Sequence, residues 1–490
     1  MVCFTALFVQ LNYIQVFKAD SLNNHPANTR QIVDDFNRER GRLEAADGTV
    51  LAFTEDADGN GNLEKQRRYP ENELFAPFTG FFSFHFGAEG AERAFNEQLI
   101  GNFDLRLNDL GRIFDEEQTV GNVRLTVEPE VQRAARDALG DRAGSVVVLD
   151  PQTGAVRAMW SYPSYDPNQM SLLSREDATK VRSALLEAPG NPLLPRAYRE
   201  RYFPGSTFKM VTAAAALSEP VGVTLDSPSF PDGPTYTPPK TSVALANFGG
   251  NLCGGPLIDL IRRSCNTGMA EIAAEFVGPE PLVTMAEDFG FNRDLPFDLP
   301  SPVVSNFPTN FGTQLEEGTE ERPAAIFENT PALAQASLGQ NEVQASPIHM
   351  AMVAAAIAND GKMMVPRVMD EVVDSKNQRV ESAQPTVWRS PVTPIVASDL
   401  RQAMEQVVAD GTAESMQLPG MTVGAKTGTA QLTGEESATH AWVIGYAGPP
   451  GESPTAAVAV IVEAVPGAEQ QTGGTVAGPI ALSVLDAALG

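Results

Sequence analysis

The sequence predicts an α/β fold of the α+β kind, in which an antiparallel sheet flanked by helices follows a smaller N-terminal domain. Residues 145–149 form an apolar, β-branched run, and a second apolar run resumes after the turn at residues 150–154. This pair predicts a β-hairpin with a buried face. Two further strand-like runs, at residues 441–447 and 455–462, flank the turn at 448–451. With apolar stretches of helical length between and after them, they predict one sheet assembled from distant pieces of chain.

Each apolar stretch of helical length supports this architecture. Residues 208–217 are rich in alanine, and residues 350–358 and 476–489 are almost continuously apolar. The first two are followed by charged or turn residues, as helix ends usually are. Residues 220–330, dense in Pro, Gly and Asn, are expected to be rich in loops.

The chain is expected to contain three parts. At 490 residues it is long enough for two to four folding units. Residues 1–17 are a candidate membrane anchor, and residues 18–142, rich in charge, Gly and Asn, predict an α+β pedestal domain with a small core. The composition changes at Gly144, so residues 143–490 are expected to form the second, larger domain.

The N-terminal segment leaves two interpretations open. Residues 2–17 are largely apolar, but Gln10, Asn12 and Gln15 interrupt them and no Lys or Arg precedes them. The segment fits a signal-anchor whose first residues lie upstream of Met1, or an amphipathic helix that packs on the rest of the protein. We favour the anchor, and no Ala-x-Ala cleavage site is evident.

Composition excludes some classes of function. With 35 Lys and Arg against 62 Asp and Glu, the formal net charge is -27, which disfavours nucleic acid as a partner. Three cysteines, without Cys-x-x-Cys or Cys/His spacing, offer no candidate structural zinc site. Cys253 and Cys265 could form a disulfide in an oxidising compartment or remain two buried thiols.

The first chemical motif is Ser206-x-x-Lys209, at the start of the alanine-rich stretch. Pro204 and Gly205 predict a turn, Ser206 is a good residue to begin a helix, and positions three apart share a helix face. Lys209 can then remove the Ser206 proton, provided that desolvation and a nearby positive charge lower its pKa. The alternative is a helix-capping serine with a solvated lysine, but Lys209 is the only lysine with Ser three residues earlier.

Two further motifs carry groups that could complete such a site. Ser264-x-Asn266 offers a hydroxyl that can pass a proton and an amide that can hold a substrate amide, although Ser21-x-Asn23 has the same pattern. Lys426-Thr427-Gly428-Thr429 is β-tolerant, and its two threonines, on one face of a strand, could bind a carboxylate. Gly428 would let another element approach closely. Taken alone, Lys426 could be an ordinary edge-strand lysine, as Lys240-Thr241-Ser242 is expected to be an ordinary loop.

The three motifs, in this order, resemble the signature of penicillin-binding proteins and class A β-lactamases. The chain is similar to class B penicillin-binding proteins, in particular the actinobacterial penicillin-binding protein A type. Further segments carry the resemblance: residues 40–43, 47–48 and 51–52 look like the opening of the class B pedestal, and residues 149–154, 163–168, 339–340, 356–361 and 472–474 resemble transpeptidase landmarks. A class A glycosyltransferase domain is not evident.

The resemblance implies a serine D,D-transpeptidase that cross-links peptidoglycan and is acylated by β-lactams. Ser206 would attack the penultimate D-Ala of a stem pentapeptide with Lys209 as base, and Ser264 would pass the proton to the leaving amine. Asn266 would hold the acyl chain, while Lys426, Thr427 and Thr429, beside Gly428, would bind the terminal carboxylate. The backbone N–H groups of Ser206 and Thr429 would form the oxyanion hole.

The resemblance also implies the setting of the reaction. Substrates would be peptidoglycan stem peptides, a glycosyltransferase is an expected partner, and no metal or cofactor is required. The catalytic domain would lie outside the cell membrane, held by a single N-terminal anchor. Two alternatives remain: a D,D-carboxypeptidase or β-lactamase-like hydrolase of the same superfamily, in which water replaces the acceptor amine, and a non-catalytic scaffold for division or elongation.

Overall fold

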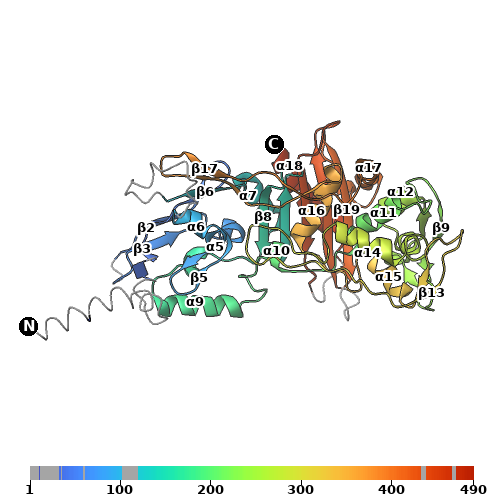
Figure 1. The fold of residues 1–490 in the computed structure, drawn as a ribbon, viewed down its shortest axis with the longest axis horizontal. Helices are drawn as coiled ribbons and strands as arrows, with labels where there is room; N and C mark the ends of the chain where they lie inside the picture. The colour runs from blue at the N-terminus through green and yellow to red at the C-terminus, as the bar shows by residue number, and fades with distance from the viewer. Residues whose placement is uncertain are drawn as a thin grey trace, which may run out of the picture.

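A computed structural model describes residues 10, 33–34, 36–58, 61–101, 120–431, 438–465 and 471–490 (Figure 1). Apart from residue 10, the expected membrane anchor at residues 1–17 lies outside the described residues. Within the described part of the chain, no helix has both the length and the apolar composition needed to cross a bilayer.

A five-stranded antiparallel sheet forms the centre of the larger domain. The expected hairpin is confirmed, because Val147 pairs with Met159. The two C-terminal strands pair with each other and then with the hairpin, which confirms a sheet assembled from distant pieces of chain. In sheet order the strands are β19 (Thr422–Gln431), β20 (Thr439–Gly448), β21 (Ala456–Val462), β7 (Gly144–Leu149) and β8 (Val156–Tyr162).

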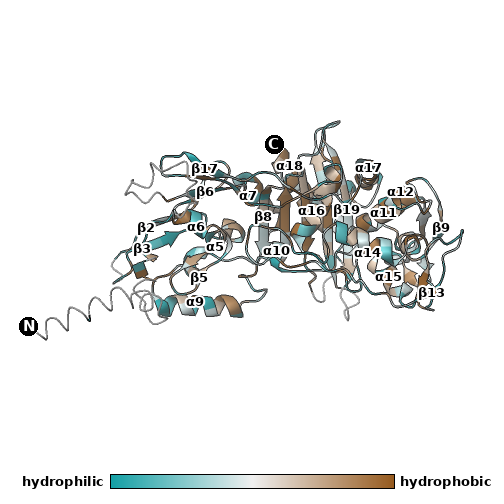
Figure 2. Cartoon of the chain, viewed as in Figure 1, coloured by the Kyte–Doolittle hydropathy of each residue, from teal (hydrophilic) through white to brown (hydrophobic). Residues whose placement is uncertain are grey.

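Helices cover this sheet, and every residue of β21 is buried. The completely buried helix α16 (Pro347–Ala358) packs on β7, β20 and β21, while α18 (Gly478–Leu489) contacts β21 and α7 (Pro129–Leu139). Figure 2 shows the apolar residues concentrated in this layered region. The helix α9 (Arg175–Glu187) lies beside the N-terminal part of the molecule (Figure 1) and contacts α8 (Pro167–Met170). The remaining helices of the domain are α10 (Arg196–Arg199), α11 (Lys209–Ser218), α12 (Leu257–Arg262), α13 (Asn266–Glu271), α14 (Pro279–Asp288), α15 (Thr330–Ala336) and α17 (Pro394–Asp410).

Pairs of short strands complete the larger domain. Four two-stranded pairs are β9 (Phe230–Gly233) with β12 (Cys253–Gly255), β10 (Thr235–Tyr236) with β11 (Leu245–Ala246), β13 (Gln314–Glu316) with β14 (Ile326–Phe327), and β15 (Met363–Met364) with β18 (Val387–Arg389). The loop-rich character expected for residues 220–330 holds around these pairs, but α12, α13 and α14 occupy much of residues 257–288.

The N-terminal part forms a mixed α+β unit at one end of the molecule (Figure 1). Its sheet contains β17 (Arg379–Ser382), β16 (Met369–Val373), β6 (Asn122–Leu125), β1 (Leu43–Glu44), β2 (Val50–Asp56) and β3 (Lys65–Arg68), in that order. Beside it lie β4 (Phe82–Ser83), β5 (Gly87–Ala88), α4 (Ala76–Thr79), α5 (Gly90–Ala94) and α6 (Asn96–Leu99). Two of its strands therefore come from residues 369–382, a contribution that no local pattern predicted.

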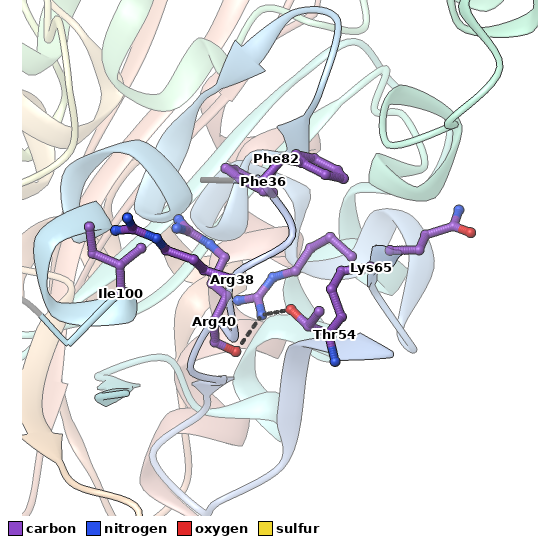
Figure 3. Close-up of a pocket in the computed structure, with 9 residues that line it drawn as sticks. Phe36, Arg38, Arg40, Thr54, Lys65, Phe82 and Ile100 are labelled. Atoms are coloured by element: carbon purple, nitrogen blue, oxygen red, sulfur yellow. Dashed lines mark hydrogen bonds between the residues drawn. The ribbon is translucent and has the colours of Figure 1, made fainter. Parts of the chain in front are cut away.

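A buried charge network holds the pedestal together. Glu92 has no exposed side-chain surface and accepts from Arg40 Nε at 2.7 Å and from Arg67 Nε at 2.6 Å. The Tyr69 hydroxyl donates to the same carboxylate at 3.2 Å. The Arg40 guanidinium also lies over the Phe82 ring, at the edge of a small pocket (Figure 3). Loss of any one member would leave buried charges without their partners.

Candidate active site

Ser206 lies in a tight turn beside the edge of the central sheet. Gly205 has a φ of 53°, and its N–H donates to the Gly339 carbonyl at 3.0 Å. Ser206 sits in the 3-10 turn η3 (Gly205–Thr207), while α11 begins at Lys209 with Phe208 as its N-cap. The expectation that Ser206 itself begins the helix is therefore wrong by one turn, because the left-handed Gly205 leads into a separate 3-10 turn.

The absence of a side chain at residue 428 allows this turn to approach the sheet. A Cβ at Gly428 would lie 2.9 Å from the Pro204 carbonyl oxygen and 3.0 Å from Thr207 Cγ2. Residues 424–430 form part of strand β19, as the sequence predicted, and β19 lies at one edge of the sheet. Gly428 therefore does what the motif indicated, because it lets η3 pack directly against the strand.

Lys209 connects the first motif to the second. Its side chain is completely buried, and its Nζ donates to the Ser264 carbonyl oxygen at 2.8 Å and to Asn266 Oδ1 at 2.7 Å. The Ser264 hydroxyl oxygen lies 3.4 Å from the same nitrogen. The lysine one turn after Ser206 is thus fixed by both polar residues of Ser264-x-Asn266.

Lys426 connects the third motif to the second. Its Nζ, also without exposed surface, donates to Ser264 Oγ at 2.8 Å and to the Thr427 carbonyl oxygen at 2.9 Å. The Ser264 hydroxyl therefore lies between the amines of Lys209 and Lys426. A hydroxyl can both accept and donate a hydrogen bond, so this position suits proton transfer.

Burial lowers the pKa of both amines. Desolvation lowers the pKa of Lys209 well below its usual value, and the nearby Lys426 lowers it further. Desolvation alone lowers the pKa of Lys426 to about 7. A lysine base must be neutral, so the lowered pKa of Lys209 favours that role, in the direction that the sequence indicated.

A cavity of about 1080 Å³ opens in front of these groups. Its wall includes five of the residues singled out from the sequence: Ser206, Ser264, Asn266, Thr427 and Thr429. Lys209, Lys426 and Gly428 lie behind this wall, so all eight candidate residues gather at one place. Within the described part of the chain, the charged side chains of the wall are Arg263 and Glu414.

A disulfide fixes the loop that carries Ser264. Cys265 is bonded to Cys253 of β12, with Cα atoms 5.6 Å apart, which resolves the choice between a bridge and free thiols. Ser264 itself has a φ of 60°, an uncommon conformation for a residue with a side chain. The cross-link lies next to this strained residue and limits the alternatives open to the loop.

Asn247 is a site residue that sequence analysis missed. Its Oδ1 accepts from the backbone N–H of Asn266 at 2.8 Å and of Thr267 at 3.0 Å, at the start of α13. The amide of Asn266 also donates to the Ala246 carbonyl oxygen at 2.9 Å. Asn247 lies in a loop-rich segment with no recognisable motif, so nothing in the sequence distinguished it from an ordinary turn residue.

A serine, two buried lysines and a hydroxyl-bearing strand around one cleft define a serine acyltransferase site of the penicillin-recognising kind. Residues 144–486 match the family model of the penicillin-binding protein transpeptidase domain, and residues 40–123 match that of the penicillin-binding protein A dimerisation domain. The chain belongs to the penicillin-binding protein family.

The chain is similar to other proteins over almost the whole length of both chains. The peptidoglycan D,D-transpeptidase PbpA of Mycolicibacterium smegmatis is 36% identical over 507 residues, which cover 100% of this chain and 97% of that protein. PbpA of Mycobacterium tuberculosis is 34% identical, with the same coverage of both chains. The ceftriaxone acyl-enzyme structure of penicillin-binding protein A from M. tuberculosis superposes with a TM-score of 0.82 at 32% identity, and covers 94% of this chain and 100% of that one.

Proposed function

We propose that the protein is a peptidoglycan D,D-transpeptidase that works through an acyl-enzyme on Ser206. The observation that carries this proposal is the position of Ser264 Oγ between two amines. One belongs to Lys209, which follows Ser206 by one turn, and the other to Lys426. The full-length similarity to D,D-transpeptidases and to a β-lactam acyl-enzyme supports the same reaction.

Lys209 is the proposed base. A neutral amine has two N–H donors and one lone pair. The Ser264 carbonyl and Asn266 Oδ1 accept from the two donors, which leaves the lone pair for the Ser206 proton. Ser206 Oγ then attacks the carbonyl carbon of the penultimate D-Ala, and the backbone N–H groups of Ser206 and Thr429 stabilise the resulting oxyanion.

Ser264 and Lys426 complete the first half of the reaction. The proton held by Lys209 passes through the Ser264 hydroxyl to the leaving nitrogen, the C–N bond breaks, and D-Ala departs. Charged Lys426, with the hydroxyls of Thr427 and Thr429, binds the terminal carboxylate, and Gly428 keeps the strand close to the Ser206 turn. Asn266 Nδ2, which donates to Ala246, would hold the acyl chain of the donor.

The second half requires an acceptor amine. An amine from a neighbouring stem peptide attacks the acyl carbonyl, and Lys209 takes its proton. Lys209 returns this proton to Ser206 Oγ as the acyl–Oγ bond breaks, so Ser206 is released with the new cross-link formed. Water in place of the amine would make the protein a D,D-carboxypeptidase or a β-lactamase-like hydrolase. The pedestal and the anchor expected at residues 1–17 favour the transpeptidase.

The anchor, an extracytoplasmic catalytic domain and a glycosyltransferase partner are parts of the same proposal. Their support is the apolar N-terminal segment and the family resemblance. Cell fractionation tests the anchor: the full chain should sediment with membranes, whereas a chain lacking residues 1–32 should remain in the supernatant.

Labelling with a fluorescent penicillin tests the nucleophile. The wild type and Ser218→Ala, a control at the exposed end of α11, should label equally, and Ser206→Ala should not label. Intact-mass spectrometry should show one stable adduct per chain, since steady hydrolysis with many turnovers would favour the hydrolase. Equal labelling of wild type and Ser206→Ala would exclude Ser206, and no labelling of either would favour the scaffold.

A further inference from the structure

The strand hydroxyl at Thr427 has a partner outside the three motifs. Thr412 lies in the segment between α17 and η6 (Glu414–Met416), and its Oγ1 is 2.6 Å from Thr427 Oγ1. Both residues line the cavity. We infer that Thr412 is a positioning residue for the substrate carboxylate, which it orients by holding the Thr427 hydroxyl.

Counting hydrogens shows what the pair can do. Two hydroxyls joined by one hydrogen bond use one hydrogen in that bond and keep one other for a second acceptor. The pair therefore presents a single outward donor to the cavity. When Thr412 donates, Thr427 keeps its hydrogen for a carboxylate oxygen, and the accepted bond polarises that hydroxyl and strengthens its donation. Without Thr412, the Thr427 hydroxyl would rotate freely.

Backbone contacts with Arg262 and Gly474 hold the segment that carries Thr412. The Thr412 N–H donates to the Arg262 carbonyl oxygen at 3.3 Å, and Arg262 Nη1 in turn donates to the Asp410 carbonyl at 2.8 Å. A Cβ at Gly474 would lie 2.3 Å from the Thr412 carbonyl oxygen, so only glycine permits this approach. A Cβ at Gly411 would lie 2.6 Å from the Arg262 carbonyl oxygen. These close backbone contacts limit the movement of the segment, so the Thr412 hydroxyl is held beside Thr427.

This inference rests on the proposed function and concerns one end of its donor substrate. Through Thr427, Thr412 would orient a carboxylate next to the scissile amide. An acyl-D-Ala-D-Ala peptide and a penicillin both carry this carboxylate. The contribution of Thr412 should disappear when that carboxylate is masked.

The test compares Thr412→Val, which keeps the shape and removes the hydroxyl, with Thr412→Ser, which keeps the hydroxyl. Second-order acylation rates are measured with benzylpenicillin and with its methyl ester. Thr412→Val should slow the reaction with benzylpenicillin about tenfold, because it removes the hydrogen bond that orients the Thr427 hydroxyl toward the carboxylate, and should leave the ester within about twofold. Thr412→Ser should restore the rate, and with a D-Ala-D-Ala peptide the loss should appear mainly in KM.

Thr241→Val, in the exposed Lys240 loop, is the matched control, and thermal denaturation confirms that each variant is folded. An unchanged rate of Thr412→Val with benzylpenicillin, or an equal slowing with both compounds, would overturn the inference. A wild type that neither compound acylates would instead overturn the proposed function, and the inference with it.

Discussion

Two lysine side chains without exposed surface face the same hydroxyl, so their charges oppose each other. If both were charged, the repulsion and the loss of hydration would be severe in so dry a site. Lys209 loses its proton first, because desolvation and Lys426 both lower its pKa. The proposed roles, Lys209 as base and Lys426 as cation, therefore follow from the different surroundings of two identical side chains.

A bell-shaped pH profile should follow from this division. Acylation by benzylpenicillin requires neutral Lys209, so the rate should rise with pH as Lys209 loses its proton. It also requires charged Lys426, so the rate should fall as pH rises through the Lys426 pKa of about 7. Stopped-flow acylation rates between about pH 5 and 10 measure both limbs. The falling limb should be absent with the methyl ester, and a profile flat over this range with benzylpenicillin would contradict these roles.

Replacement of the Glu92 charge should destabilise the pedestal strongly. Burial would raise its pKa, but Arg67 and Arg40 outweigh burial and hold the pKa below its usual value. Glu92→Gln leaves two buried guanidinium groups without a counter-charge, and should lower the free energy of unfolding by about 3–5 kcal/mol. Urea titration measures the change. Glu55→Gln, which removes the partly exposed partner of Arg68, should cost less than about 1 kcal/mol, and equal losses would refute the distinction.

At the scale of elements, local sequence patterns predicted the helices and strands that depend on their own runs of apolar residues. The hairpin of β7 and β8, the strand β19 and the helix α16 follow from runs of apolar residues whose length and spacing suit one element. The close approach at Gly428 was also predictable, since only a missing side chain allows it.

Other features depend on contacts that no local pattern reports. Ser264 contacts Lys426, which is 162 positions away in the sequence, and Lys209, which is 55 positions away. Only the recognised order of the three motifs predicted that these residues lie together. β16 carries two acidic residues among its five, and β17 has a single apolar residue; β16 becomes a strand because it pairs with β6, and β17 pairs in turn with β16. Tertiary pairing decides such polar strands more than intrinsic preference does.

Gly428→Ala tests the packing of the η3 turn on β19. The new methyl group would lie 2.9 Å from the Pro204 carbonyl oxygen, so the turn that carries Ser206 must shift away from the strand. We expect benzylpenicillin acylation to slow by more than about tenfold and stability to fall by about 1–3 kcal/mol. Gly233→Ala is the control, because the nearest atom to a Cβ there is 3.6 Å away. Normal acylation by Gly428→Ala would show that the turn has more freedom than its contacts indicate.

At the scale of the whole molecule, the pedestal and the larger domain share strands and buried hydrogen bonds. Val372 of β16 pairs with Val123 of β6, so a segment from the C-terminal part completes the N-terminal sheet. Buried Gln132 donates to the Leu74 carbonyl at 2.8 Å and to the Met159 carbonyl at 2.9 Å, and it accepts from the Met159 N–H at 2.8 Å. The central sheet therefore receives part of its hydrogen bonding from residues that precede it.

Removal of the N-terminal part should consequently prevent folding of the rest. A chain of residues 143–490 would leave β16 without its partner β6 and the buried backbone groups of Met159 without Gln132, and each lost buried partner costs about 1–3 kcal/mol. It would also uncover the apolar surface beneath α7. We expect this chain to be insoluble and unreactive with fluorescent penicillin, whereas a chain of residues 36–490 should be soluble and should label like the full chain. Calorimetry of the longer chain should give one cooperative transition, because neither part is complete alone. A soluble 143–490 chain that labels at the full rate would show that the shared strands are dispensable.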